Sequence, residues 1–198
     1  MFMAFGKMKR KYRSNSPNSK NEISKDKEEN LVALISEKMN EALNEQIGKE
    51  LESAYIYLSM SMWLKEHSYN NLSNWFHIQA QEEFVHAEKF ANYIIETGGS
   101  VKLPALPQPK NDWNDVKEIV EAAYAHEQYI TGRIQDLVRL AEELREIPVK
   151  NVLNWFVEEQ IEEESSTSEL VVRQAAFRSD MLFDHHTIRT AEPTTTSE

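Results

Sequence analysis

The chain has 198 residues, of which 40% are hydrophobic, so it is long enough for one domain with a substantial core. It contains no cysteine, which excludes disulfides, zinc–thiolate sites, iron–sulfur clusters and thiol nucleophiles together. The formal net charge of −11 is uneven: residues 1–27 carry eight Lys or Arg and two Asp or Glu, whereas the remainder carries 14 basic and 31 acidic residues. We expect this acidic body to attract cations and to repel nucleic acid.

Residues 1–30 are polar, basic and rich in Ser and Asn, with too little apolar surface to offset the entropy lost on ordering. We therefore predict a disordered basic tail. Its first 21 residues lack acids, as organelle transit peptides do, but no amphipathic Arg-rich helix accompanies them, so we favour a tail over targeting. No apolar run approaches the roughly 18 residues that a membrane span needs, and we expect a cytoplasmic protein.

The first two predicted helices form a hairpin. Ser36 is a candidate N-cap, and the helical pattern of apolar residues after it continues to about His67. A polar turn at residues 68–71 leads into a second pattern, which Gly98 and Gly99 end. The apolar positions are Leu43, Ile47, Leu51, Ala54, Leu58 and Leu64 in the first helix, and Leu72, Trp75, Phe76, Phe90 and Ile94 in the second.

A long connection precedes the third helix. Residues 99–112 contain three prolines within six positions, so they cannot be helical, and they are long enough to run the length of a bundle. The third helix carries apolar positions from Val116 to Ala141 and is expected to stop near Pro148, because proline disfavours helix in the residue before it.

The fourth helix is predicted from Val149 to about Gln174. The patterns together indicate an all-α four-helix bundle over residues 31–178, with a long crossover between its second and third helices. Residues 179–198 contain the segment MLFDHHTIRT, for which we predict a short fifth helix, and then a polar tail.

Polar residues interrupt the apolar pattern of all four long helices at similar heights along the bundle. They are Glu50 in the first helix, Glu83 and His86 in the second, Glu127 in the third, and Gln160 and Glu163 in the fourth. Glu83 and His86 are three residues apart and project from one helix face, which suits one bound ion. Counted from the turns, Glu50 lies level with Glu83, and Glu127 lies near the level of Gln160.

Several carboxylates buried without partners would each cost several kcal/mol. No Lys or Arg occupies the matching inner positions of the four patterns, so protons or metal ions must compensate. Carboxylates with one imidazole and no sulfur favour iron or manganese, although zinc could also bind. Any one of these residues alone is more often a partly exposed side chain, and it is their coincidence on four helices that indicates a two-metal site.

The chain resembles the non-haem ferritins of bacteria and archaea over about residues 35–164. The motifs that carry the resemblance are SEKMNEALNEQIGKELESAYIYLSM, SNWFHIQAQEEFVHAEKF, YAHEQYITGRIQDL and LNWFVEEQIEEE, in that order. The resemblance implies a ferritin-like bundle with the long crossover described above. It also implies a ferroxidase that oxidises Fe(II) with dioxygen or peroxide and stores it as mineral in a homo-oligomeric shell, for which 24 subunits are expected.

By that resemblance, Glu50, Glu83 and His86 bind one iron. Glu83 is the bridge, and Glu127 and Gln160 complete the second iron site. The resemblance further implies a third iron site leading inward, for which the alternative is a solvated acidic face. The residues that match this third site are Glu82, Glu159, Glu162 and Glu163.

Two aromatic residues match positions beside the di-iron centre of the family, Tyr57 and Trp155. Either could supply an electron during oxygen reduction or could simply belong to the core, and we favour the redox role only for Tyr57. The second helix has no methionine in its central segment, and the fourth helix shows Glu159-Gln160-Ile161-Glu162 where bacterioferritins would show Glu-x-x-His, so a haem-binding bacterioferritin is disfavoured. His126 lies about 100° around the helix from Glu127 and is expected at a surface or interface.

The resemblance ends after Glu164, where the chain is shorter than the family pattern and lacks its glycine turn, which bears on the symmetry of assembly. One alternative function is a rubrerythrin-like di-iron oxidase or peroxidase, although this class has two Glu-x-x-His motifs. Another is a DNA-protecting ferritin-like shell, in which the basic tail contacts phosphates. Such small shells place their iron ligands between subunits, whereas this chain carries a full set within one bundle.

Overall fold

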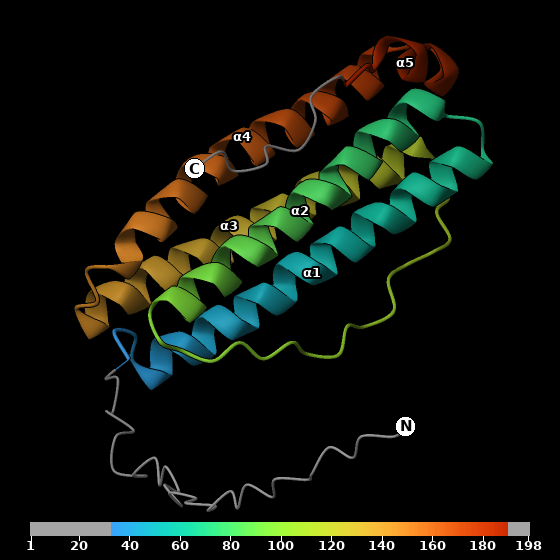
Figure 1. Cartoon of the computed structure of the whole chain (residues 1–198). Coiled ribbons are helices and arrows are strands. Elements are labelled where there is room, and N and C mark those ends of the chain that lie inside the picture. Colours follow the sequence, from blue (N-terminus) through green and yellow to red (C-terminus); the bar gives the residue numbers. More distant parts are fainter. Residues whose placement is uncertain (1–32, 190–198) are drawn as a thin grey trace, which may run out of the picture. The chain divides into compact units, whose positions relative to one another are not determined.

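The computed structural model describes residues 33–189, and the predicted basic tail at residues 1–30 lies outside the described part. Five helices and no strand occur in the described range (Figure 1). They are α1 (Glu37–Glu66), α2 (Asn70–Glu96), α3 (Val116–Leu144), α4 (Val149–Ala176) and α5 (Asp180–His186). The predicted all-α class is confirmed, and α5 is the short fifth helix that the sequence predicts. No helix between residues 33 and 189 combines the length and the apolar character needed to cross a membrane.

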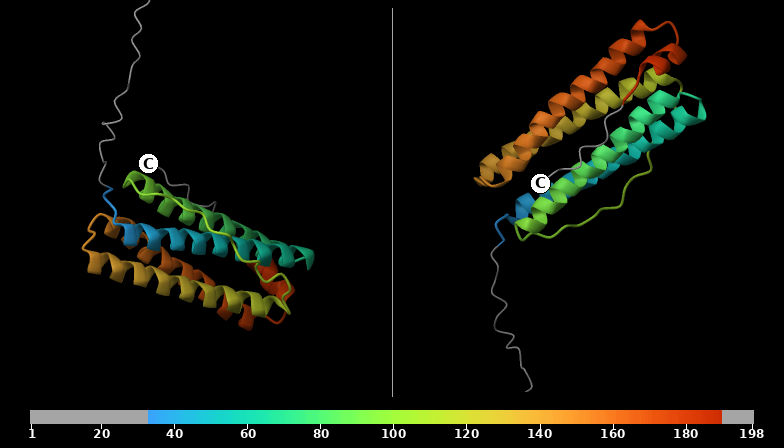
Figure 2. Two further views of the ribbon diagram at one scale, coloured as in Figure 1. Left: turned by 90° about the horizontal axis from the view of Figure 1, so that it is seen from below. Right: turned by 45° about the horizontal axis from the view of Figure 1, so that its top comes forward.

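The four long helices form two hairpins that pack side by side as a bundle. Helices α1 and α2 make one hairpin and α3 and α4 the other, as both views in Figure 2 show. The connection between α2 and α3 runs back along α1, so that α3 points in the same direction as α2 (Figure 1). This is the long crossover expected from the prolines. The four helix centres are thereby brought to one level.

Polar side chains cap the N-termini of three of the five described helices, α1, α3 and α5. The Ser36 side chain accepts a hydrogen bond from the Met39 N–H at 3.2 Å, so the predicted N-cap of α1 is confirmed. Two predicted ends differ by a few residues. Helix α2 begins at Asn70, inside the predicted turn, and α3 ends at Leu144 because Arg145 adopts a left-handed backbone with φ of 57°.

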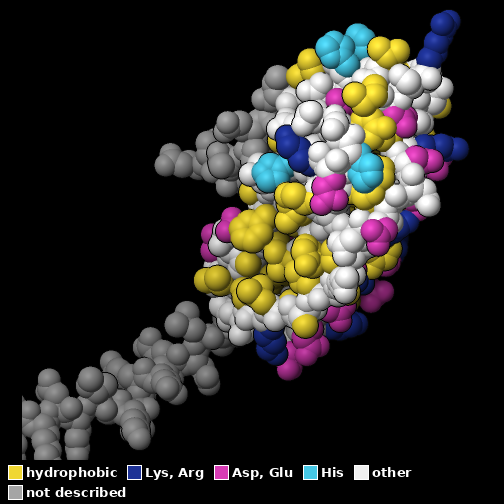
Figure 3. All heavy atoms as spheres, turned by 90° about the vertical axis from the view of Figure 1, so that its right-hand side faces the viewer, with side chains coloured by type: hydrophobic (Ala, Val, Ile, Leu, Met, Phe, Trp, Pro, Cys, Tyr) yellow, Lys and Arg dark blue, Asp and Glu magenta, His cyan; other side chains and the backbone are white. Residues whose placement is uncertain are grey.

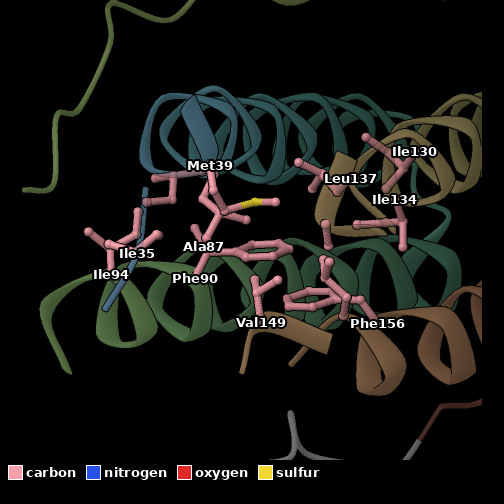
Figure 4. Close-up of a cluster of buried hydrophobic side chains, with 14 residues drawn as sticks. Ile35, Met39, Ala87, Phe90, Ile94, Ile130, Ile134, Leu137, Val149 and Phe156 are labelled. Atoms are coloured by element: carbon pink, nitrogen blue, oxygen red, sulfur yellow. The ribbon is translucent and has the colours of Figure 1, made fainter. Parts of the chain in front are cut away.

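Two hydrophobic clusters make up the core, and each long helix contributes to both. One cluster, drawn in Figure 4, occupies the end of the bundle where α1 begins and contains Met39, Phe90, Ile134 and Phe156. The other cluster contains Tyr57, Phe76 and Leu170. In every long helix the polar interruptions fall in sequence between the residues of the two clusters. The core is therefore two apolar regions separated by a buried polar layer.

We predict that Phe90→Ala lowers the free energy of unfolding by about 3–5 kcal/mol. The Phe90 ring is fully buried and stacks on Phe156 with ring centroids 3.9 Å apart, so truncation leaves a cavity that four helices cannot easily close. Urea unfolding followed by circular dichroism measures the change. The control is Ile95→Ala on the same helix, whose side chain is 63% exposed and which should cost under about 0.5 kcal/mol. Equal costs for the two variants would contradict this account of the core.

Candidate metal centre

The polar layer is buried on all sides. Each of its main residues is at most 5% exposed, although all can carry charge or hydrogen-bond strongly. These residues are Glu50, Glu83, His86, Glu127, Gln160 and Glu163. The structure thus brings together the residues that interrupt the four apolar patterns, while their role as iron ligands stays a prediction.

Helices α1 and α2 supply the first group of candidate ligands. One atom each of Glu50, Glu83 and His86 lies within 4.8 Å of the others, which is close enough for all three to contact one ion. The His86 Nδ1 atom is 3.3 Å from Glu83 Oε2, as expected for residues three apart on one helix face. Carboxylate oxygens with one imidazole nitrogen suit iron, manganese or zinc.

Helices α3 and α4 close the layer from the other side. The Gln160 side-chain amide donates to Glu127 Oε2 at 3.2 Å, so these two residues meet as the turn-based counting predicts. The Tyr57 hydroxyl donates to the other oxygen, Glu127 Oε1. Glu127 therefore has both oxygens engaged, by a neighbour on α4 and by one on α1.

Two buried glutamines support the carboxylates, and the sequence interpretation gave neither a role. The Gln46 side chain donates to Glu50 Oε1 at 3.0 Å from one helical turn away. The Gln79 side chain donates to Glu163 Oε2 at 2.6 Å and also approaches Glu83 Oε1 at 3.5 Å. Both glutamines stand four residues before a ligand candidate, and this repeated Gln-x-x-x-Glu spacing is the signal that could have found them.

The residues matched to a third site divide into three cases. Glu159 and Glu163 come within 4.8 Å of His86 and form a second potential metal group. Glu82 instead forms an ion pair with Arg189, a contact that no helical pattern predicts. Glu162 is exposed on α4 and lies outside both groups of described residues. The structure therefore gathers only part of this set.

Two further aromatic or histidine side chains lie against the layer. Trp155 packs edge-on against His86 with ring centroids 5.6 Å apart, close to the centre as its match implies. The expectation for His126 is wrong, because its ring is half-buried between α1 and α3, where Nε2 lies 2.7 Å from the Ser53 hydroxyl. A residue 100° from the ligand face can still be covered when the neighbouring helix packs closely there.

Burial raises the pKa of three of the four buried glutamates in the layer. It raises the pKa of Glu50 to about 8, with nearby Glu83 adding to the effect, and it raises the pKa of Glu163 to about 8 as well. The pKa of Glu127 also rises well above its usual value, mainly through burial. At neutral pH the metal-free centre therefore favours neutral carboxyls at these three positions.

Glu83 and His86 behave differently because they face each other. Burial opposes ionisation of Glu83, but the charge and hydrogen bond of His86 bring its pKa below the usual value. Burial likewise opposes protonation of His86, but the nearby carboxylates of Glu159, 3.7 Å from its Nε2, and of Glu83, which is hydrogen-bonded to its Nδ1, hold the pKa of His86 well above the usual value. Without a metal, the layer contains one internal ion pair and several protons. These donors fit a bound cation, which would replace the protons and satisfy the buried oxygens.

Comparison with known proteins agrees with this geometry. A family model described as a ferritin-like domain matches residues 40–175. The chain belongs to the ferritin family. It is 37% identical over 132 residues to a bacterial non-heme ferritin of Campylobacter jejuni, covering 67% of this chain and 79% of that protein. It is also 34% identical to a bacterial non-heme ferritin of Bacteroides fragilis, covering 70% of this chain and 87% of that one.

Solved ferritin structures are also similar to this chain. An open pore ferritin from the archaeon Archaeoglobus fulgidus matches with a TM-score of 0.76 and 39% sequence identity, covering 80% of this chain and 99% of that one. A humanized archaeal ferritin matches with a TM-score of 0.77 and 36% identity, covering 79% and 99% of the two chains. The fold and the family resemblance expected from the sequence motifs are thereby confirmed.

We predict that Glu50→Gln stabilises the metal-free protein at high pH but not at low pH. The folded-state pKa of Glu50, about 8, lies above its ordinary value of 4.5, so the wild type loses stability as the pH rises from 4.5 through 8. Glutamine carries no charge and escapes this loss. The free energy of unfolding in the variant should exceed that of the wild type by an amount on the order of a few kcal/mol at about pH 9, and match it near pH 4.5.

Urea unfolding in a metal chelator at several pH values tests this prediction. The matched control is Glu41→Gln, an exposed glutamate on the same helix, for which the difference from wild type should not grow with pH. A constant difference between Glu50→Gln and wild type across the range would mean that the Glu50 carboxyl is not held neutral by burial.

Proposed function

We propose that this ferritin family member is a ferroxidase that stores the iron it oxidises. The observation that carries the proposal is the buried layer of four glutamates and His86 within a single bundle, with no Lys or Arg among the buried residues of the described range. Burial of that much negative charge is stable only with protons or cations. Membership of the ferritin family supports iron as the cation.

In this proposal Fe(II) is the substrate and binds in pairs. Glu50, Glu83 and His86 bind one ion, and Glu83 bridges to a second ion. Glu127 and Gln160 complete the second site, which should bind more weakly because the Gln160 amide oxygen is a neutral ligand. Binding displaces the protons held in the metal-free layer, and these protons leave to solvent.

The oxidation balances as a two-electron reaction. Each of two Fe(II) ions gives one electron, and dioxygen takes both electrons and two protons to become hydrogen peroxide. Peroxide can act as the oxidant in place of dioxygen, since it takes two electrons and two protons to become water. The Fe(III) formed is a harder cation, and the acidic residues outside the pair, among them Glu159 and Glu163, would lead it toward a mineral core.

We further propose a homo-oligomeric cytoplasmic shell of 24 copies. Figure 3 views the molecule from the side of the α1–α2 turn and shows hydrophobic side chains gathered in one area with charged side chains at its edge. Among the described residues, large apolar side chains such as Tyr55 on α1 and Phe84 on α2 are about half exposed and line an apolar hollow with Leu106 of the crossover. Such a surface supports contact with another copy of the chain.

We predict that Glu83→Ala reduces aerobic Fe(II) oxidation to the rate without protein. Glu83 serves both ions in the proposal, so its loss removes the pair rather than one site. Absorbance after mixing about two Fe(II) per chain measures the initial rate. The matched control is Glu88→Ala, an exposed glutamate on the same helix, which should oxidise iron like the wild type.

The outcomes separate the candidate functions. Wild-type oxidation no faster than the control without protein would overturn the ferroxidase proposal and leave a structural ferritin-like shell. Fast oxidation with peroxide but not with dioxygen would favour a rubrerythrin-like peroxidase instead. Salt-dependent DNA retention that is lost on deleting residues 1–30 would add a DNA-protecting role to the shell.

We predict that Tyr57→Phe retains metal binding but slows oxidation about tenfold, equivalent to about 1.4 kcal/mol of activation free energy. Tyr57 is fully buried and its hydroxyl donates to Glu127, so the phenol can give a further electron, beside the two from iron, to the dioxygen being reduced while its proton passes to the Glu127 carboxylate. Stopped-flow absorbance gives the rate, and electron paramagnetic resonance after freeze-quenching detects a tyrosyl radical, which the variant should lack. Tyr55→Phe, half exposed on the same helix, is the control. Unchanged kinetics in Tyr57→Phe would make this residue a core aromatic only.

A further inference from the structure

The residues after α5 run along α2 and place the Arg189 side chain at the edge of the buried polar layer. We call residues 187–189 the C-terminal arm. Its start is held by Arg173, which donates to the His186 carbonyl at 2.6 Å, and its end by Asn74, which donates to the Arg189 carbonyl at 3.2 Å. Helix α5 is itself tied to α2, because the Leu72 N–H donates to Asp184 Oδ1 at 2.8 Å. The path of the arm is therefore specified by side-chain contacts at both ends.

The Arg189 side chain reaches across the outer edge of the polar layer. Its guanidinium pairs with the Glu82 carboxylate and donates to Gln79 Oε1 at 2.7 Å. It also lies over the Trp75 ring, 4.7 Å from the centroid. The side chains of Arg189 and Glu82 are only 19% and 14% exposed, so solvent screens this ion pair far less than it screens a surface pair.

Gln79 connects Arg189 to the buried carboxylates through hydrogen bonds. Its amide oxygen accepts from Arg189, so its amide nitrogen must face the opposite way, where it donates to Glu163 at 2.6 Å and approaches Glu83 at 3.5 Å. A primary amide has one oxygen and one nitrogen, and the guanidinium, which only donates, fixes which of them faces the carboxylates. The arm thus holds Glu163 in a hydrogen bond as well as pairing Glu82.

The Arg189 guanidinium lies beside the Glu82 carboxylate, where a metal ion bound to Glu82 would also have to lie. A divalent cation at Glu82 would have to approach a guanidinium of like charge, and one at Glu163 would have to break the hydrogen bond from Gln79. Glu159 and Glu163 lie within 4.8 Å of His86, so the remaining ligands of such a site are close by. The arm and a metal ion therefore compete directly for Glu82, and a metal ion at Glu163 competes with the hydrogen bond from Gln79 that the arm orients.

We propose that Arg189 is a built-in counter-cation that competes with divalent metal ions for Glu82 and, by orienting Gln79, holds Glu163 in a hydrogen bond, so that the C-terminal arm limits metal binding beyond the central pair. This inference rests on the proposed function, since it concerns a third ion next to the two that Glu83 serves. The arm makes the outer carboxylates available only to an ion that displaces Arg189. The arm thereby limits which ions bind at the acidic residues next to the central metal pair.

The test counts redox-silent Zn²⁺ ions bound by the assembled, metal-free full-length protein in calorimetric titrations. The main variant is Arg189→Met, which removes the guanidinium but keeps an apolar stem to cover Trp75. Arg189→Ala serves as the second variant should Met fold poorly, and circular dichroism checks both. Arg178→Ala, an exposed arginine outside the arm, is the control for losing one positive charge.

Removing the Arg189 guanidinium should tighten binding of a third Zn²⁺ at least tenfold relative to wild type and to Arg178→Ala, and adding Glu82→Gln should abolish the gain. A third Zn²⁺ bound no more tightly by the folded Arg189 variants than by wild type and Arg178→Ala would overturn the proposal. Failure of the proposed function looks different: wild-type Fe(II) oxidation would then be no faster than without protein, and failure of its central metal pair would leave Glu83→Ala binding as many Zn²⁺ ions tightly as the wild type, whatever the Arg189 variants do.

Discussion

The structure depends on the burial of negative charge at mid-bundle. Glu50, Glu83, Glu127 and Glu163 are each at most 5% exposed, and the one buried side chain that can match them with positive charge from within the layer is His86. A carboxylate removed from water costs several kcal/mol unless it is paired, protonated or bound to a metal. The metal-free protein satisfies this constraint with one ion pair and several protonated carboxyls. Both contributions to stability decrease as the pH rises, because His86 and the carboxyls then lose their protons.

The rest of the fold offsets the free-energy cost of burying that layer. Hydrophobic clusters on both sides contribute the burial that offsets its cost, and each long helix passes through both clusters. Buried amides then fix the orientation of the carboxylates: Gln46 holds Glu50, and Gln160 holds Glu127. A preorganised set of carboxylates costs little to reorganise on binding a cation, which is what the proposed ferroxidase site requires.

The sequence predicts the helices and their convergence because both follow from regular geometry. Ser36 begins α1 as predicted, and counting from the turns matches Glu50 with Glu83 and Glu127 with Gln160, since the rise per residue in a helix is constant. Helix ends follow from local backbone choices, so the left-handed Arg145 ended α3 before the expected proline. His126 was misplaced because the closeness of a neighbouring helix is a property of packing that no single helical pattern contains.

The position of Arg189 is the feature of the site that helical periodicity could not predict. Arg189 lies 110 residues from Gln79 along the chain and outside every long helix, and its position depends on how α5 docks on α2. No Lys or Arg is buried in the four long helices that the structure describes, yet Arg189 brings a cation to the layer from the segment where the resemblance to the family has ended. Because the guanidinium fixes the Gln79 amide, and that amide contacts both Glu83 and Glu163, the arm is energetically part of the buried polar layer. A change in the least family-like part of the chain can therefore alter the hydrogen bonding and charge of this layer without replacing any of its carboxylates.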